Sequence, residues 1–242
     1  MGDKLYTNIP IEECGEPLAP IPPTFLRLEP HPYQSLGAPY GTASPFYLRV
    51  GVIAALERAQ AFLKPYGWQL AIFDAYRPVV VQQFMVAHTF ATLCREGGHN
   101  PEQLEPAIAS QIWQQVYQFW AVPSLDPQKP PPHSTGAAVD LTLADGENRP
   151  LDMGGVIDEI SERSFPDFYS CHPEQTNAIC FAQRRQILHQ AMHCAGFQRH
   201  PNEWWHFSLG DQLWAWQIQQ QTGQQNIIAR YGQIDPCGYL IT

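Results

Sequence analysis

A histidine and an aspartate, His133 and Asp140, bracket a run of small residues (Ser-Thr-Gly-Ala-Ala-Val). An imidazole nitrogen and a carboxylate oxygen are both good ligands for zinc. Residues 137–143 are mostly apolar and predict a strand, which would bury Asp140. A buried carboxylate needs a metal, another cation or several hydrogen-bond donors. This segment alone leaves two alternatives open: Asp140 binds a metal, or it caps a turn or pairs with an arginine.

A second chemically capable segment is Glu203-Trp204-Trp205-His206. A carboxylate beside a metal-bound water can take its proton and later give it to a leaving amine. Side chains alternate along a strand, so Glu203 and His206 reach one metal only if Glu203 lies in the loop before the strand, or if a bulge intervenes. Taken alone, the segment favours the alternative of a core strand with both tryptophans inside and Glu203 in solvent.

A third segment, Asp74-Ala75-Tyr76-Arg77-Pro78, follows an apolar stretch that predicts a strand over residues 68–74. Arg77 is a permanent cation and could stabilise the oxyanion of a tetrahedral intermediate. The alternative is an arginine that pairs with Asp74 or with a helix carboxylate. The segment by itself favours this pairing.

The elements that must position these residues can be read from periodicity and from breakers. Residues 1–45 contain nine prolines, which exclude long helices and predict an extended wrap on the domain. Helices are predicted over residues 46–64, 78–96, 101–120 and 176–195, and strands over 24–29, 68–74, 137–143, 197–200 and 204–209. The partial segregation of helices and strands favours an α+β fold, a mostly antiparallel central sheet flanked by helices.

The remaining histidines give no comparable pattern. His189 and His193 lie four residues apart on a predicted helix, but Gln190 breaks the H-E-x-x-H pattern. Both lie off the apolar stripe of that helix and are expected at the surface. Ordinary surface or core roles are expected for the other histidines without a partner pattern: His31, His88, His99, His172 and His200.

Composition bounds the class of protein. The 242 residues, 44% hydrophobic and 15% charged, predict a single globular domain over residues 1–242. A net charge of −9 argues against nucleic acid as a partner, and the lack of a long apolar run argues against a membrane span. Six cysteines without C-x-x-C pairing predict free, mostly buried thiols in a reducing compartment. With no signal-like start, this predicts a cytoplasmic protein.

Together, D-A-Y-R-P, H-x-x-G-x-A-x-D and E-W-W-H, in this order and at these separations, resemble the zinc D-alanyl-D-alanine dipeptidases of the vancomycin-resistance type. The resemblance covers about Tyr40 to Leu209. It implies an α+β fold shared with bacterial D,D-carboxypeptidases and the hedgehog signalling domain. It also implies one Zn²⁺ per chain and roles for six residues: His133, Asp140 and His206 as ligands, Glu203 as the acid and base, Arg77 at the transition state, and Asp158 at the substrate ammonium group.

One position departs from the pattern of this family. The family usually has a serine two residues before the first histidine ligand, and this chain has Pro131 there. The change removes a hydroxyl near the substrate and stiffens the loop. The metal site should survive it, while substrate preference and rate stay open.

The resemblance therefore implies a metallopeptidase that hydrolyses D-alanyl-D-alanine, or a similar short D,D-dipeptide, to free amino acids. One alternative is a D,D-carboxypeptidase or endopeptidase of peptidoglycan stem peptides, which would need an open cleft and export. Another is a non-catalytic, hedgehog-like zinc module, which Glu203 and Arg77 together disfavour because a structural zinc site usually has four protein ligands. The exact dipeptide and the oligomeric state stay open.

Overall fold

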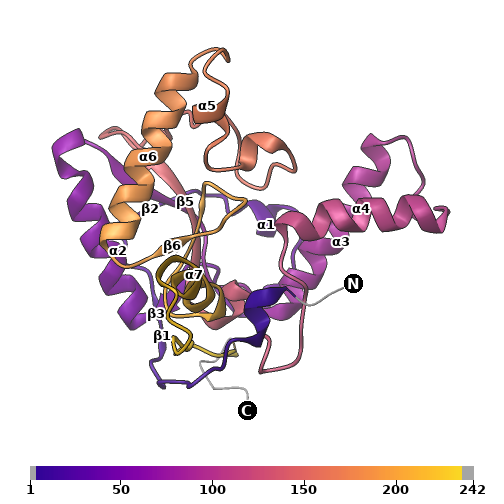
Figure 1. Ribbon diagram of the computed structural model, residues 1–242, viewed down its shortest axis with the longest axis horizontal. Helices are drawn as coiled ribbons and strands as arrows, with labels where there is room; N and C mark the ends of the chain where they lie inside the picture. Colours follow the sequence, from indigo (N-terminus) through magenta and orange to yellow (C-terminus); the bar gives the residue numbers. More distant parts are fainter. Residues whose placement is uncertain (1–3, 236–242) are drawn as a thin grey trace.

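A five-stranded sheet forms the centre of the protein in the computed structural model, which describes residues 4–235 (Figure 1). The strand order is β2-β4-β5-β7-β6. Only β2 and β4 run parallel, and the other neighbours are antiparallel. The prediction of an α+β fold with a mostly antiparallel sheet is confirmed. The strand bounds are β2 Leu26–Arg27, β4 Gln69–Asp74, β5 Ala138–Ala144, β6 Gln198–Arg199 and β7 His206–Ser208.

One face of this sheet is apolar and is covered by two helices, α2 (Val50–Leu63) and α6 (Ala178–Cys194), which lie side by side (Figure 1). Strand β5 shows the alternation most clearly. Val139, Leu141 and Leu143 join the main core with these helices, and Asp140 between them does not. Because side chains alternate along a strand, Asp140 is presented on the opposite face of the sheet.

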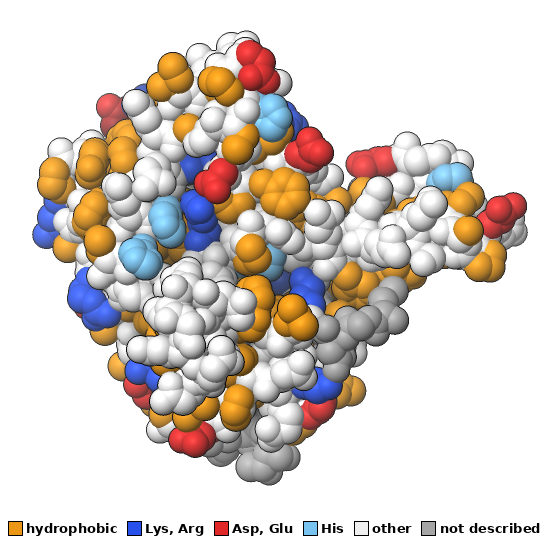
Figure 2. All heavy atoms as spheres, viewed as in Figure 1, with side chains coloured by type: hydrophobic (Ala, Val, Ile, Leu, Met, Phe, Trp, Pro, Cys, Tyr) orange, Lys and Arg blue, Asp and Glu red, His pale blue; other side chains and the backbone are white. Residues whose placement is uncertain are grey.

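A second group of helices forms an arm. Helices α3 (Val79–Glu96) and α4 (Pro106–Phe119) pack against each other and carry a second apolar cluster. Figure 2 shows this arm projecting from the body of the molecule beside a notch. Smaller elements complete the fold: α1 (Pro32–Ser35), α5 (Phe168–Cys171), α7 (Gln212–Thr222) and the 3-10 turns η1 (Leu5–Asn8), η2 (Lys64–Tyr66), η3 (Pro132–Thr135) and η4 (Glu162–Ser164).

The proline-rich stretch packs on the domain through several short pairings. Strand β1 (Leu18–Pro20) pairs antiparallel with β3 (Tyr47–Arg49), and β2 joins the central sheet. Arg49 ties this region to the rest through its guanidinium, which bonds Glu13 at 3.0 Å and the Thr135 carbonyl at 2.7 Å. The assignment of one domain to residues 1–242, with a wrap over about 1–45, stays a prediction.

Several predicted boundaries were wrong, each for a local reason. The helix expected from residue 46 begins at Val50, because residues 47–49 are taken up by pairing with β1. The helix expected from residue 101 begins at Glu105–Pro106, where Pro106 suits the first turn. The strand expected from residue 204 begins at His206. The tail, left ambiguous by the sequence, contains α7.

The cysteine prediction needs a correction. All five cysteines in the described part are free, but only Cys94 is buried; Cys14, Cys171 and Cys194 are exposed and Cys180 is intermediate. The exposed cysteines lie in the N-terminal stretch or at the ends of α5 and α6, which are at the surface of the molecule. Cys237 lies outside the described residues. Among residues 4–235, no helix has both the length and the apolarity needed to cross a membrane.

Candidate active site

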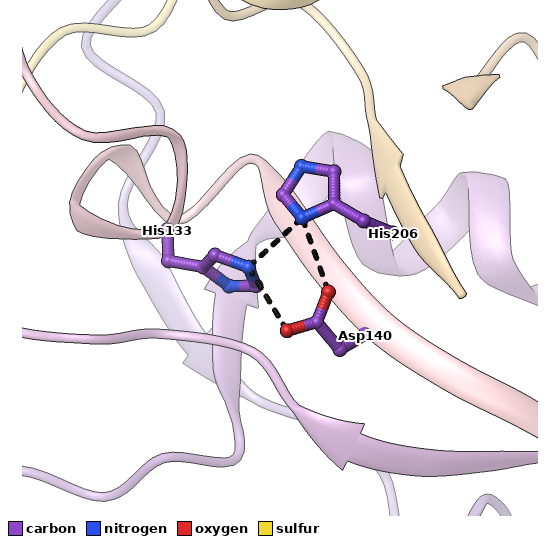
Figure 3. A group of neighbouring side chains, drawn as sticks. All are labelled: His133, Asp140 and His206. Atoms are coloured by element: carbon purple, nitrogen blue, oxygen red, sulfur yellow. Dashed lines mark hydrogen bonds and ion pairs between the residues drawn. The ribbon is translucent and has the colours of Figure 1, made fainter. Parts of the chain in front are cut away.

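Three of the candidate residues converge on the face of the sheet opposite the main core (Figure 3). Asp140 in β5 and His206 in β7 are direct partners in the antiparallel register, so their side chains are neighbours. His133 comes from the turn η3, just before β5. All three side chains are buried. The structure thus brings together residues 73 positions apart in the sequence.

The spacing of their ligand atoms fits a zinc ion. His133 Nε2 lies 3.2 Å from Asp140 Oδ2 and 3.2 Å from His206 Nδ1, and His206 Nδ1 lies 3.1 Å from Asp140 Oδ1. Tetrahedral zinc with bonds of about 2.0–2.1 Å sets its ligand atoms about 3.3 Å apart. With both oxygens of Asp140 counted, each pair of these side chains therefore approaches to a separation close to that between two ligand atoms of one zinc ion.

Protonation at the cluster points to a cation as well. His133 Nδ1 lies 2.7 Å from the carbonyl oxygen of Ala75, which can only accept, so Nδ1 carries the proton. Nε2 of His133 then presents a lone pair to the carboxylate of Asp140. Within the described residues, Asp140 Oδ1 is buried and accepts no well-aligned hydrogen bond, although His206 Nδ1 lies 3.1 Å away. A metal ion resolves both features, and a carbonyl behind the ligand is the usual support of a metal-binding histidine.

Arg77 lies beside this cluster, between β4 and α3, and is buried. Its Nε donates to Asp74 at 2.9 Å and its Nη1 to Gln82 at 2.8 Å, while Nη2 lies 3.2 Å from Asp140 Oδ2. Burial disfavours the charged form, but Tyr33 and the two carboxylates outweigh it and raise the pKa of Arg77 well above its ordinary value. The pairing with Asp74 is present, and it holds the cation next to the metal cluster.

Asp74 accepts hydrogen bonds from Arg77 and from two further side chains. From the sequence alone, it was considered only as a possible ion-pair partner of Arg77. His31 Nε2 and the Tyr40 hydroxyl each lie 3.0 Å from Asp74 Oδ1. Burial raises the pKa of Asp74, but Arg77 and the hydrogen bond from His31 outweigh it and lower the pKa. His31 and Tyr40 come from the proline-rich stretch, so that stretch supports the site.

Glu203 lies in the turn before β7, as the loop alternative requires. Its Oε2 is 3.7 Å from His206 Nδ1, and its side chain is buried. Burial, reinforced by the charge of Asp140, raises the pKa of Glu203 well above its ordinary value. Glu203 lines a pocket at this site together with Trp205, and both Trp204 and Trp205 are buried in the main core.

Sequence reasoning missed the contact made by His200. This residue is buried, lines the pocket and places Nδ1 3.4 Å from Glu203 Oε1. Nδ1 also accepts the backbone N–H of Asn202 at 3.2 Å, which leaves it unprotonated. Burial, with help from the nearby His206 and Lys4, lowers the pKa of His200 well below its ordinary value. The available signal was its place three residues before Glu203, across a Pro-Asn turn.

The two histidines that lie four residues apart on α6, His189 and His193, are not part of this site. His193 is exposed, as expected, whereas His189 is only partly exposed and its buried Nδ1 has no hydrogen-bond partner among residues 4–235. The rings of the two are 5.5 Å apart. Neither residue joins the group of side chains that could hold a metal.

Asp158 borders the same pocket. The hydroxyl of Tyr33 donates to Asp158 Oδ2 at 2.6 Å. Burial, with the charge of Asp140, raises the pKa of Asp158 to about 7. Asp158 also has a φ of 67°, a left-handed conformation that a non-glycine residue adopts at some cost. The pocket thus combines a metal-ligand set, a buried carboxylate, an arginine and a further acid.

Comparison with known proteins points the same way. The family model described as D-ala-D-ala dipeptidase, peptidase family M15, matches residues 27–224. A D-alanyl-D-alanine dipeptidase of Synechocystis sp. is 48% identical over 241 residues, covering 96% of this chain and 97% of that protein. One of Escherichia coli is 32% identical over 163 residues, covering 67% and 66%.

Among solved structures, VanYB in complex with D-Alanine-D-Alanine is similar at a TM-score of 0.46 and 17% identity, covering 72% of this chain and 78% of that one. The family match and the Synechocystis relative both span most of the sequence, including every candidate site residue. On this evidence the chain belongs to the D-Ala-D-Ala dipeptidase family.

Proposed function

We propose that this chain is a zinc-dependent dipeptidase that hydrolyses D-alanyl-D-alanine, or a similar short D,D-dipeptide, to free amino acids. The observation that carries the proposal is the buried cluster of His133, Asp140 and His206, in which each pair of side chains approaches to 3.1–3.2 Å, with Glu203 beside it. Three protein ligands leave a position free for water or substrate, as catalytic zinc sites do. Membership of the dipeptidase family supports the substrate class.

The proposed roles follow from the positions of the side chains. When bound, zinc lowers the pKa of a coordinated water toward about 7 and polarises the scissile carbonyl. Glu203 takes a proton from the attacking water and passes it to the departing amine. Arg77, fixed by Asp74, places a cation beside the reacting carbonyl, where negative charge develops.

Asp158 is proposed to bind the free ammonium group of the dipeptide. It borders the pocket, and its carboxylate is oriented by the hydroxyl of Tyr33. Tyr33 in turn is linked to Arg77, whose Nη2 lies 3.2 Å away. The ammonium site and the oxyanion site are therefore connected through a single tyrosine, which fixes the position of one relative to the other.

We also propose a cytoplasmic location. The support is that all five described cysteines are free, three of them exposed. Exposed unpaired thiols are typical of a reducing compartment.

The direct test is release of D-alanine from D-Ala-D-Ala by the purified chain, with zinc content measured on the same sample. We expect about one zinc per chain and release that stops on chelation and returns with added zinc. Release that survives complete zinc removal would contradict the metal assignment. Bound zinc with release only from a stem peptide ending in D-Ala-D-Ala would favour the carboxypeptidase alternative.

A further inference from the structure

The N-terminal end of the described chain borders the catalytic pocket. Lys4 and Tyr6 line it together with Glu203 and His200. The turn η1, which follows Lys4, packs against α7, and Tyr6 is buried there. The segment that carries Lys4 is therefore part of the pocket wall.

One side chain of α7 fastens this segment in place. Gln212 Nε2 lies 2.6 Å from the carbonyl oxygen of Ile9, 3.3 Å from that of Thr7 and 2.9 Å from that of Gln128. Gln128 belongs to the proline-rich loop that leads to His133. The N-terminal segment, the loop and α7 thus meet at one amide group, which positions Lys4 relative to the metal ligands.

Lys4 and Arg77 are the two cations among the residues that line this pocket. Arg77 is occupied, because its guanidinium donates to Asp74 and Gln82 and contacts Asp140. For Lys4, no carboxylate of residues 4–235 lies within the 4.0 Å of an ion pair. Its burial lowers its pKa, an effect that the charge of Glu203 opposes. A partly buried ammonium without an ion-pair partner is poised for an anionic ligand.

The surroundings of Lys4 differ from those of Asp158. Lys4 also lines a neighbouring hollow with Tyr6, Pro130 and Pro131, on the side of the pocket formed by the proline run. Pro131 has neither a hydroxyl nor a backbone N–H to offer a substrate. Asp158 instead lies against Tyr33 and shares neither this hollow nor the next one that Lys4 lines. Asp158 and Lys4 therefore border different parts of the pocket, and Lys4 forms no ion pair with a carboxylate of residues 4–235.

We propose that Lys4 binds the free carboxylate of the dipeptide, so that the pocket recognises both charged ends of a zwitterionic substrate. This inference rests on the proposed function and adds the residue that selects for an unblocked C-terminus. Substrates longer at the C-terminus or amidated there lose this ion pair.

The test compares Lys4→Met with Lys4→Arg on two substrates, D-Ala-D-Ala and D-alanyl-D-alaninamide. A hydrogen bond between charged groups suggests that Lys4→Met lowers kcat/KM for the acid by about 10- to 100-fold, through KM. For the amide, kcat/KM should change by less than about threefold, because this substrate has no carboxylate whose ion pair with Lys4 could be lost. Lys4→Arg should keep most of the activity on both substrates.

Controls separate this role from a structural one. Lys64→Met removes the same charge at an exposed position of η2 and should leave both substrates unchanged. Equal losses on acid and amide, or no loss on either, would overturn the role of Lys4. A wild-type chain that releases D-alanine from neither substrate would instead overturn the proposed function, and the inference with it. Zinc content and melting temperature of each variant report whether the site and fold are intact.

Discussion

The metal side and the substrate side of the pocket are built from different kinds of structure. On the metal side, Asp140 and His206 are paired neighbours on adjacent strands, and Arg77 follows the end of a third. On the substrate side, Asp158 lies in an irregular segment, and Lys4 lies at the N-terminal end of the described chain. Sheet strands hold side chains more firmly than loops do, and loops vary more readily. Two of the three proposed ligands are thus held by the sheet, whereas the residues proposed to select the substrate lie in segments that can change independently.

Two buried arginines, Arg77 on the metal side and Arg185 on the substrate side, differ in the same way. Arg77 is paired with carboxylates, at 2.7 Å from Asp74 and 3.2 Å from Asp140. Arg185 on α6 forms no ion pair within the described residues and donates to two backbone carbonyls, those of Met153 and Phe165. Burial lowers the pKa of Arg185 to about 10. Arg77 is proposed to act through its charge, whereas Arg185 holds both ends of the segment that carries Asp158 through its hydrogen bonds.

The largest expected effect is on the metal side, at Glu203. Glu203→Gln keeps the shape of the side chain but removes the group that moves the proton, so kcat should fall by about 10²- to 10⁴-fold. Zinc content should stay at that of the wild type, because Glu203 is not among the three ligand residues. Steady-state kinetics and metal analysis on one preparation check both points.

Glu57→Gln, at an exposed position of α2, is the matched control and should behave as the wild type. Wild-type turnover in Glu203→Gln would remove Glu203 from the mechanism. Loss of zinc along with turnover would show that its role is to hold the metal site together.

The next largest effect is expected at Arg77, where a substitution tests whether the several donors of the guanidinium matter as well as its charge. Arg77→Lys keeps the cation but cannot donate to Asp74, Gln82 and Tyr33 together. We expect kcat to fall by about 100-fold, with a smaller change in KM, because stabilisation of developing charge acts on the transition state. Arg95→Lys, at an exposed position near the end of α3, supplies the control. A change confined to KM would place Arg77 in substrate binding.

A smaller effect is expected from Arg185→Met on the substrate side. The methionine fills part of the space, but the bonds to Met153 O at 2.8 Å and Phe165 O at 3.0 Å are lost. The free energy of unfolding should fall by about 2–4 kcal/mol. If the tie positions Asp158, KM should rise several-fold while kcat stays near that of the wild type. Urea unfolding and kinetics measure the two; lower stability with unchanged KM would reduce Arg185 to a structural role.

The same contrast marks what could be predicted from the sequence. On the metal side, residue types left a metal ligand or a capped or arginine-paired Asp140 open, and only the resemblance of the three segments together singled out His133, Asp140 and His206. The register that pairs β5 with β7 could not be read, because strand pairing depends on contacts between distant segments. The start of α2 at Val50 was missed for the same reason, since β1 captures the preceding residues.

The supporting contacts were harder still. His31 and Tyr40 reach Asp74 from 43 and 34 positions earlier in the chain, out of a stretch whose composition indicates only an extended wrap. His200 contacts Glu203 across a turn whose geometry no local pattern specifies. Lys4 has no motif around it at all. These residues belong to the site because of tertiary packing, and residue type carries no signal for it.

The smallest effect concerns pH and Asp158. Its pKa is about 7 in the folded chain, above the ordinary value of 3.8, so its proton is held more tightly in the folded state. The folded state therefore loses stability as pH rises from about 4 to about 7, where the unfolded chain is already ionised.

A substrate ammonium needs the ionised form of Asp158, so KM for D-Ala-D-Ala should fall as pH rises through about 7. Asp158→Asn removes this group and should flatten that part of the KM profile, while any change in kcat with pH remains. Since Asn still accepts from Tyr33, the tie to Arg77 is kept, and the comparison isolates the charge. Identical KM profiles for the two would show that the ammonium group is bound elsewhere, and the substrate side would then rest on Lys4 alone.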